Sequence, residues 1–333
     1  MPSKYTDIGG QAVLEGVMMR SPADEKMAIA VRRESGQIVV ESETVKALSK
    51  KHKWMGWPVV RGVVNFVSML KIGYQTISKS SAMLGLEEEE PSRFEKWLAA
   101  KLGKSTEAVV MGAAMVVAMV LAVGLFFLLP AFVAQLLKRF IASAVAVNLV
   151  EGAVRMVIFI GYMLAVSAMK EIRRTFMYHG AEHKTIACFE AGEALTPQNA
   201  RKYPRQHPRC GTAFLLIVMV VSILIFSVFG VNINMWTRLA SRLLLLPVVA
   251  GVSYELLKWL GHCDNLLARA LRAPGMWLQN LTTREPDEGM LEVAICAFNA
   301  CTNGRYAVHA DAEQPEPARE KTAQDADACA QSV

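Results

Sequence analysis

Four long apolar spans occupy the middle of this 333-residue chain and restrict what it can fold into. Each has the length of about 20 residues that a helix needs to cross a bilayer. The hydrophobic content of 53% is too high for an ordinary soluble protein. We therefore expect a mainly α membrane protein with four transmembrane helices in the lipid bilayer. We place these helices at about 109–135, 149–169, 212–230 and 239–260.

Basic residues between the spans predict the orientation. The loop 170–209 is rich in Lys and Arg, whereas the two opposite loops are short and carry basic residues only at their edges. Loops rich in Lys and Arg stay in the cytoplasm. The loop 170–209 is therefore expected to be cytoplasmic and, with four spans, so are both termini. The net charge of +6 follows this flanking pattern, so we expect no nucleic-acid partner.

The segments outside the spans are expected to form a small α+β cytoplasmic cap. Residues 27–33 and 37–40 are typical of a β-hairpin with a glycine turn. Residues 58–80 predict an amphipathic helix, and whether it inserts in the membrane stays open. The expected order is an N-terminal α+β segment (1–86), a linker with a juxtamembrane helix (87–108), two transmembrane helices (109–169), a central loop (170–211), two more transmembrane helices (212–262), a C-terminal segment (263–310) and a disordered tail (311–333).

The run His179-Gly180-Ala181-Glu182-His183 in the central loop is the strongest indication of chemistry. On a helix, His179 and His183 are four residues apart, so their imidazoles project from one face and can share a metal ion. The order His-x-x-Glu-His is the inverted form of a zinc-protease helix. We therefore expect a divalent metal, with zinc favoured by imidazole and thiolate ligands. Glu182 is the expected catalytic base.

Three further residues are candidates for completing the metal site. His207 and Cys210 directly precede the third span, and Glu255 lies near the cytoplasmic end of the fourth. In an open site, Glu255 or His207 is the third ligand and water takes the fourth position. In a closed site, both histidines of the motif are joined by His207 and Cys210, and the metal is structural. The alternative without metal is a pair of surface histidines touching lipid headgroups.

Other charged or nucleophilic residues allow further interpretations. Cys210 is a candidate nucleophile, because the start of the third helix would lower its pKa. Glu255 in an apolar helix is either functional or in a salt bridge. Glu151 and Arg155, four residues apart, are either a helix-stabilising pair or part of a transport path.

Four motifs are similar to those of a known family. The runs 9–20 (GGQAVLEGVMMR), 178–185 (YHGAEHKT), 207–212 (HPRCGT) and 281–286 (LTTREP) resemble the signatures of the YqhQ-like bacterial membrane proteins. The resemblance covers about residues 5–300 and implies a protein of the bacterial inner membrane. That family has no known function and is described at most as predicted metal-dependent enzymes. The resemblance alone singles out Glu15, Arg20 and Arg61 as residues that would bind substrate in the same cytoplasmic cleft.

The function that we expect is that of a membrane-embedded, metal-dependent hydrolase. It would act at the cytoplasmic face on a lipid-linked, peptide or phosphorylated substrate. One alternative is a non-enzymatic scaffold or assembly factor with a structural metal site. The other is a small transporter, which with four spans would have to work as a homo-oligomer.

Overall fold

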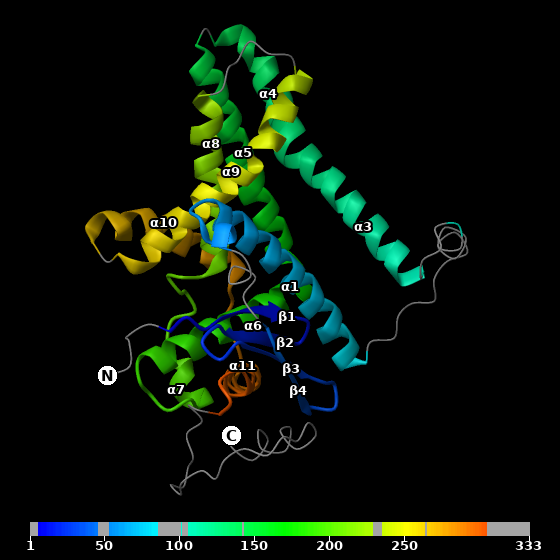
Figure 1. The fold of residues 1–333 in the computed structure, drawn as a ribbon, viewed down its shortest axis with the longest axis vertical. Helices are drawn as coiled ribbons and strands as arrows, with labels where there is room; N and C mark the ends of the chain where they lie inside the picture. Colours follow the sequence, from blue (N-terminus) through cyan, green and yellow to red (C-terminus); the bar gives the residue numbers. More distant parts are fainter. Residues whose placement is uncertain are drawn as a thin grey trace, which may run out of the picture. The chain divides into compact units, whose positions relative to one another are not determined.

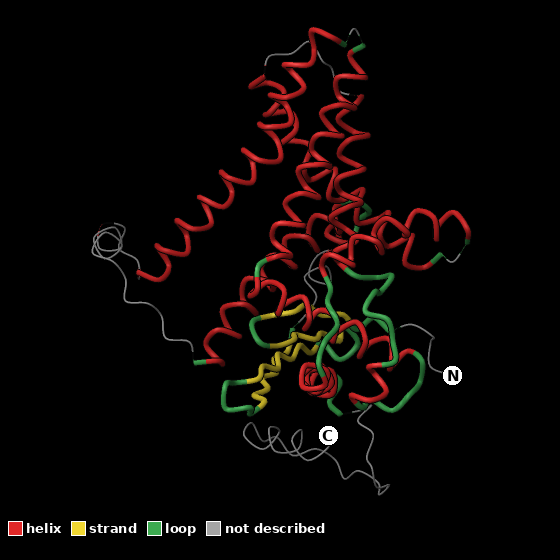
Figure 2. Tube along the Cα trace, turned by 180° about the vertical axis from the view of Figure 1, so that it is seen from behind, coloured by secondary structure: helices red, strands yellow, loops and turns green. Residues whose placement is uncertain are grey.

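The computed structural model describes residues 6–45, 53–85, 101, 106–141, 143–228, 235–263 and 265–304. This part is mainly helical, and its strands form one four-stranded sheet near the N-terminus (Figures 1 and 2). The prediction of a mainly α protein with strands in the N-terminal segment is confirmed. The predicted tail 311–333 and most of the predicted linker 87–108 lie outside the described residues.

The strands are β1 (Gly9–Val13), β2 (Gly16–Ser21), β3 (Lys26–Arg32) and β4 (Ile38–Thr44). The helices are η2 (Lys53–Gly56), α1 (Val60–Leu84), α3 (Thr106–Val123), the π-helix η3 (Gly124–Leu128), α4 (Leu129–Leu137), η4 (Lys138–Phe140), α5 (Ala144–Ala168), α6 (Lys170–Glu190), α7 (Pro197–Arg201), α8 (Gly211–Val228), α9 (Met235–His262), α10 (Leu266–Thr282) and α11 (Glu288–Cys301). Two compact units result, the first comprising Met1–Gly85, Met163–Val218 and Ala250–Val333 and the second Leu86–Tyr162 and Met219–Val249.

The sheet of the first unit is an antiparallel meander in the order β1-β2-β3-β4. Its second hairpin, β3–β4, matches the predicted one. Its first hairpin was not predicted, because the two-residue turn Leu14–Glu15 lacks the usual glycine or asparagine. Glu15 instead adopts a φ of 49°, in the left-handed region.

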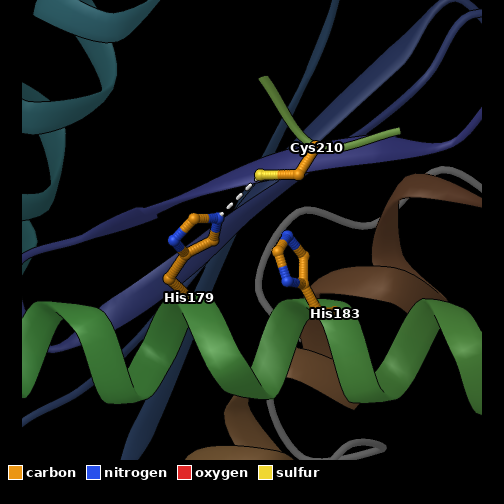
Figure 3. A group of neighbouring side chains, drawn as sticks. All are labelled: His179, His183 and Cys210. Carbon is orange, nitrogen blue, oxygen red and sulfur yellow. Dashed lines mark hydrogen bonds between the residues drawn. The ribbon is translucent and has the colours of Figure 1, made fainter. Parts of the chain in front are cut away.

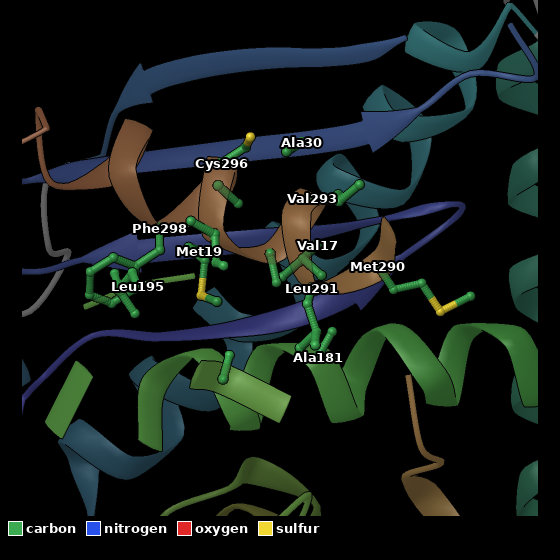
Figure 4. Close-up of a cluster of buried hydrophobic side chains, with 14 of the residues drawn as sticks. Val17, Met19, Ala30, Ala181, Leu195, Met290, Leu291, Val293, Cys296 and Phe298 are labelled. Carbon is green, nitrogen blue, oxygen red and sulfur yellow. The ribbon is translucent and has the colours of Figure 1, made fainter. Parts of the chain in front are cut away.

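Both faces of the sheet are covered, which explains the nearly continuous apolar runs of β2 and β3. α1 packs on one face, where Met83 joins Met18 and Ile29. α6 and α11 pack on the other, where Val17 and Met19 meet side chains of α11 such as Leu291 (Figure 4). The N-terminal segment, the central loop and the C-terminal segment therefore share one core in this unit.

α6, which carries the histidine motif, begins after an interruption of the helical backbone at Met169. We expected the second apolar helix to continue into the motif, but Met169 is extended (φ −69°, ψ 136°) and separates α5 from α6. Arg173 N–H donates to the Met169 carbonyl and starts the new helix. α6 therefore belongs to the core under the sheet and is not an extension of α5.

Three described helices are long and apolar enough to cross a membrane: Gly112–Phe140, Val145–Ala168 and Leu239–Gly261. These match three of the four predicted spans. The remaining span, the third along the chain, corresponds to α8, whose apolar stretch Gly211–Ser227 is shorter. Residues 229 and 230, with which we ended this span, lie outside the described residues.

A buried ion cluster joins the apolar helices of the second unit. The Glu151 carboxylate accepts hydrogen bonds from Arg155 Nη2 at 2.9 Å and from Arg242 Nη2 at 2.8 Å. Arg155 Nε also donates to the Phe126 carbonyl at 2.9 Å, within the π-helix η3. The predicted Glu151–Arg155 pair therefore helps to join three helices.

Candidate metal centre

His179, His183 and Cys210 form a buried group whose ligand atoms all lie within 4.8 Å of one another. The two imidazoles project from the same side of α6 toward the sulfur of Cys210, which comes from the turn before α8 (Figure 3). His179 Nε2 lies 3.2 Å from Cys210 Sγ. The four-residue spacing thus places both rings at one site, and the sulfur arrives from a segment 27 to 31 residues further on.

Two backbone carbonyls fix the orientation of the imidazoles. His179 Nδ1 lies 2.8 Å from the Thr282 oxygen, and His183 Nδ1 lies 2.6 Å from the Arg205 oxygen. A carbonyl only accepts, so both Nδ1 atoms carry a proton, and each ring in its neutral form presents its Nε2 lone pair to the site. His183 Nε2 is buried and has no hydrogen-bond partner. This arrangement is typical of metal-binding histidines, whose second nitrogen donates to a carbonyl or carboxylate.

The segment after α10 packs closely against α6 and thereby positions the Thr282 carbonyl. Arg284 N–H donates to the Phe176 carbonyl at 2.8 Å, which draws the chain after α10 onto α6. A Cβ on Gly180 would lie closer than 3.0 Å to the Arg284 oxygen, a separation that real Cβ atoms essentially never show. The glycine of the motif is therefore needed for the approach that brings the Thr282 oxygen to His179.

A buried lysine, Lys184, positions the Arg205 carbonyl that orients His183. The ammonium group of Lys184 donates to the carbonyls of Arg201 at 3.0 Å and Tyr203 at 2.8 Å, and it forms an ion pair with Glu285. These contacts satisfy carbonyls at the end of α7 and hold the following loop against α6. The Arg205 oxygen lies on that loop, so Lys184 supports the hydrogen bond to His183.

The turn that carries Cys210 is held by a buried glutamine of α10. Gln279 has no exposed surface, and its amide pairs with both backbone groups of His207, at 2.8 and 2.9 Å. Thr212 N–H points to Cys210 Sγ at 3.4 Å, because the sulfur lies at the start of α8. Backbone N–H groups at a helix start stabilise a thiolate.

Burial and the neighbouring ligands act in opposite directions on the pKa values of Cys210 and His179. Burial by itself would raise the pKa of the Cys210 thiol, but the imidazoles of His183 and His179 hold it well below its usual range. Burial would lower the pKa of His179, but the Cys210 sulfur beside it raises that pKa to about 9. Without metal, the sulfur is therefore a thiolate paired with an imidazolium.

Glu182 lies beside this group and has one unused carboxylate oxygen. Its Oε1 accepts from Gly10 N–H of the edge strand β1 at 2.9 Å, whereas its Oε2 is buried without a hydrogen-bond partner. Burial raises the pKa of this carboxyl, although the two neighbouring imidazoles oppose the shift. A buried carboxylate oxygen without a partner is costly unless a ligand, ion or water occupies the site.

The residues present fit a zinc ion. Zinc is bound by imidazole nitrogens at about 2.0–2.1 Å and thiolate sulfur at about 2.3 Å in a tetrahedron, which keeps ligand atoms about 3.5 Å apart. The 3.2 Å between His179 Nε2 and Cys210 Sγ is close to this value, and no pair of ligand atoms in the group would have to close by more than about 1.3 Å. Three protein ligands would leave one position of the tetrahedron for water or substrate.

Two candidate ligands lie outside the group. His207 is buried, but its Nε2 lies 3.6 Å from the Glu190 carboxylate and 3.5 Å from Arg209 Nη2. Its ring is 5.6 Å from that of His183, centroid to centroid. Glu255 is held by Arg61, whose Nε donates to it at 2.6 Å.

The residues singled out by resemblance also lie apart from one another. Glu15 pairs with Arg174 of α6, at 2.6 Å from its Nη2, and thereby ties the first hairpin to the helix with the motif. Arg61 pairs with Glu255 between α1 and α9. Arg20 is half-buried on β2, its Nε has no hydrogen-bond partner, and burial lowers its pKa.

Sequence reasoning missed the groups that orient the ligands. The carbonyls of Thr282 and Arg205 act through the backbone, so their residue types carry no signal. The only sequence signal for Gln279 and Lys184 is that each is a polar residue in a segment that is otherwise expected to be buried. The LTTREP run did point to the correct segment, although not to its role.

The comparisons with known proteins bear on the family and not on the chemistry. Residues 57–303 match the family described as "Protein of unknown function (DUF1385)". The chain is 32% identical over 294 residues to the "Uncharacterized protein YqhQ" of Bacillus subtilis (strain 168), covering 87% of this chain and 91% of that protein. No solved structure matches the chain. The resemblance in the four motifs is thereby confirmed, and the chain belongs to the DUF1385 family of YqhQ-like proteins.

Proposed function

We propose that this protein is a membrane-embedded, zinc-dependent hydrolase that acts at the cytoplasmic face of the bacterial inner membrane. The buried His179, His183 and Cys210 would hold the metal, and Glu182 would act as the general base. The observation that carries the proposal is that the ligand atoms of both histidines and the Cys210 sulfur converge, while both Nδ1 atoms lie against backbone carbonyl oxygens.

The number of ligands favours an open site. His207 and Glu255, the other candidate ligands, are engaged with Glu190 and Arg61 respectively. A zinc ion with three protein ligands keeps a position for water or substrate, lowers the pKa of that water and polarises a substrate carbonyl or phosphoryl oxygen.

Each neighbouring residue then has a defined task. Glu182 Oε2, which has no hydrogen-bond partner, accepts the proton of the attacking water, while Gly10 N–H holds the other oxygen in place. The carbonyls of Thr282 and Arg205 keep both imidazoles in the tautomer that binds metal.

The membrane arrangement is part of the same proposal. The three long apolar helices and α8 as a fourth, shorter crossing give both termini a cytoplasmic location, because the basic loop 170–209 is then cytoplasmic. The metal site would lie at the level where α8 begins and α9 ends.

The test compares Glu182→Gln with Glu171→Gln, an exposed glutamate in the first turn of the same helix. The zinc-loaded, full-length proteins in lipid nanodiscs are incubated with a bacterial membrane extract, and new products are identified by mass spectrometry. We expect products with the native protein and Glu171→Gln but not with Glu182→Gln, whose zinc content is unchanged. Equal products from all three, or from the native protein after zinc removal, would exclude this role.

A second candidate function uses Cys210 as a nucleophile. The favouring observation is the 3.2 Å contact between His179 Nε2 and a thiolate at the start of α8. In this reading His179 transfers protons, as in cysteine hydrolases. Rapid alkylation of Cys210 by iodoacetamide in protein purified without chelators would favour it, because a zinc-bound thiolate is shielded.

A further inference from the structure

Two amphipathic helices, α1 and α10, each have an apolar face that the described residues leave uncovered. The exposed apolar residues of α1 lie within about 100° of the helix circumference and are Phe66, Val67, Leu70, Tyr74 and Ile77. α10 has a similar face, on which Leu266 is exposed by 85%, Leu267 by 60% and Trp277 by 57%. Contiguous apolar faces of this kind mark contact with a membrane or another molecule.

Both helices pack against the first turn of α8, which directly follows Cys210. On one side, the rings of Phe66 in α1 and Phe214 lie 6.0 Å apart, centroid to centroid. On the other, α10 approaches so closely that a Cβ on Gly275 would lie 3.0 Å from the Ala213 Cβ. α1 and α10 therefore flank the start of α8 at one level and extend from it to different sides (Figure 1).

Both helices are also attached to the end of a membrane-length helix. A Cβ on Gly62 of α1 would lie 2.8 Å from the Gly251 Cα, and Asn65 Nδ2 donates to Tyr254 Oη at 2.8 Å. Gly251 and Tyr254 belong to the apolar span Leu239–Gly261. α10 begins four residues after α9, the helix that contains this span, ends. The uncovered faces of α1 and α10 thus lie where a helix long and apolar enough to cross a membrane ends.

The charges on the two helices match a phospholipid surface. Neither helix contains an aspartate or a glutamate, whereas α1 carries Arg61, Lys71 and Lys79 and α10 carries Arg269 and Arg272. Arg61 and Lys79 form ion pairs with other elements, and Lys71 is exposed at the border of the apolar face. Basic residues beside an apolar face with leucine and tryptophan are typical of helices that lie in the membrane interface, where anionic headgroups attract them.

Both helices also contact groups that orient the metal centre. α10 ends at Thr282, whose carbonyl lies against His179. α1 contacts the edge strand β1, where Gln11 Nε2 donates to Thr76 Oγ1. The glycine that precedes Gln11 donates its N–H to Glu182. The positions of α1 and α10 therefore bear on the groups that hold a metal ligand and the proposed base.

We propose that α1 and α10 lie in the interface of the lipid bilayer, with their apolar faces among the upper acyl chains and their basic residues at anionic headgroups. The two helices hold the metal centre at the level of the headgroups. This placement assigns residues 58–80 to the membrane surface. It goes beyond the proposed hydrolase and does not depend on the chemistry of the metal centre.

The experiment measures the surroundings of single side chains by electron paramagnetic resonance. A nitroxide amino acid is genetically encoded at Leu70, Leu267 or Gln75, so that the native cysteines stay unlabelled. The full-length proteins are placed in nanodiscs of phosphatidylethanolamine and phosphatidylglycerol. Gln75 is the matched control, because it is exposed and lies about 140° around α1 from Leu70. Collisions of each label with oxygen, which concentrates in lipid, and with a water-soluble nickel complex are measured.

We expect the labels at Leu70 and Leu267 to be accessible to oxygen and shielded from the nickel complex. The ratio of oxygen to nickel accessibility should be several-fold higher at these two positions than at Gln75. Nickel accessibility at Leu70 or Leu267 equal to that at Gln75 would place the face in water and overturn the proposal. Low accessibility to both reagents, with dipolar broadening between labels, would show a second copy of the chain on the face and would overturn it as well.

Zinc content measured on the same samples separates this placement from the proposed hydrolase. Lipid-exposed labels in a protein that binds no zinc would support the membrane placement and exclude the hydrolase alone. Zinc binding in a protein whose labels lie in water would exclude the membrane placement alone.

Discussion

Gly180→Ala should weaken both the fold and the metal site, although alanine is the better helix former. The new methyl group would overlap the Arg284 carbonyl oxygen and touch Pro286 at 3.4 Å. The segment after α10 would have to move by about 1 Å to restore ordinary contact. That shift strains the hydrogen bonds from Arg284 N–H to Phe176 and from His179 to Thr282.

The magnitude follows from three contributions. Overpacking costs about 1–3 kcal/mol, and the two hydrogen bonds contribute about 1 kcal/mol each. Replacing a mid-helix glycine by alanine stabilises the helix by about 1 kcal/mol, which offsets part of this loss. We therefore expect the free energy of unfolding to fall by about 2–4 kcal/mol. Loss of the carbonyl that orients His179 should also weaken zinc binding about 10–100-fold.

The assay is thermal unfolding in detergent together with zinc titration. The matched control is Gly73→Ala in α1, where the new Cβ would meet the side-chain amide of Gln11 at ordinary distances, 3.5 Å from Oε1 and 4.0 Å from Nε2. This control should unfold at the native temperature or above it, with native zinc affinity. If Gly180→Ala also behaved as the native protein, the close approach of residues 282–286 to α6 would be refuted.

Four further substitutions test individual contacts. Gln279→Leu leaves two buried backbone groups unpaired and should lower the free energy of unfolding by about 2–4 kcal/mol, measured by denaturant titration; an unchanged midpoint would contradict the buried pairing. Lys184→Met should weaken zinc binding about tenfold by releasing the loop with the Arg205 carbonyl, and unchanged affinity in a zinc titration would show that the loop does not depend on it. Glu151→Gln leaves buried guanidinium groups without their carboxylate and should cost about 3–5 kcal/mol, whereas Arg174→Ala, in an exposed ion pair, should cost less than about 1 kcal/mol in the same unfolding assay. Equal effects of the last two would refute the burial of the cluster.

The features that were predictable from sequence depend on local periodicity. Apolar runs of membrane length, the β3–β4 hairpin and the amphipathic helix α1 each follow from residues close together in the chain. The shared face of His179 and His183 follows from the helical repeat in the same way. The β1–β2 hairpin was missed because its two-residue turn, Leu14–Glu15, lacks the glycine or asparagine that usually marks such a turn.

The third ligand could not be chosen from sequence. His207 and Cys210 are separated by two residues, and only the path of the turn decides which of them meets the histidines. Gln279, 69 residues beyond Cys210, fixes that path. The partner of Glu255 was equally hidden, since Arg61 lies 194 residues away. Such long-range pairings depend on how α1 and α10 dock, and composition gives no sign of that.

Metal analysis of detergent-purified, full-length protein tests the central claim most directly. Native protein, Cys210→Ser and His207→Ala are compared by elemental mass spectrometry after loading with zinc and removal of excess. We expect roughly one zinc ion per chain in the native protein and in His207→Ala, and none retained by Cys210→Ser. A native protein that retains no zinc, or loss of zinc in His207→Ala with retention in Cys210→Ser, would contradict the assignment of the metal to His179, His183 and Cys210.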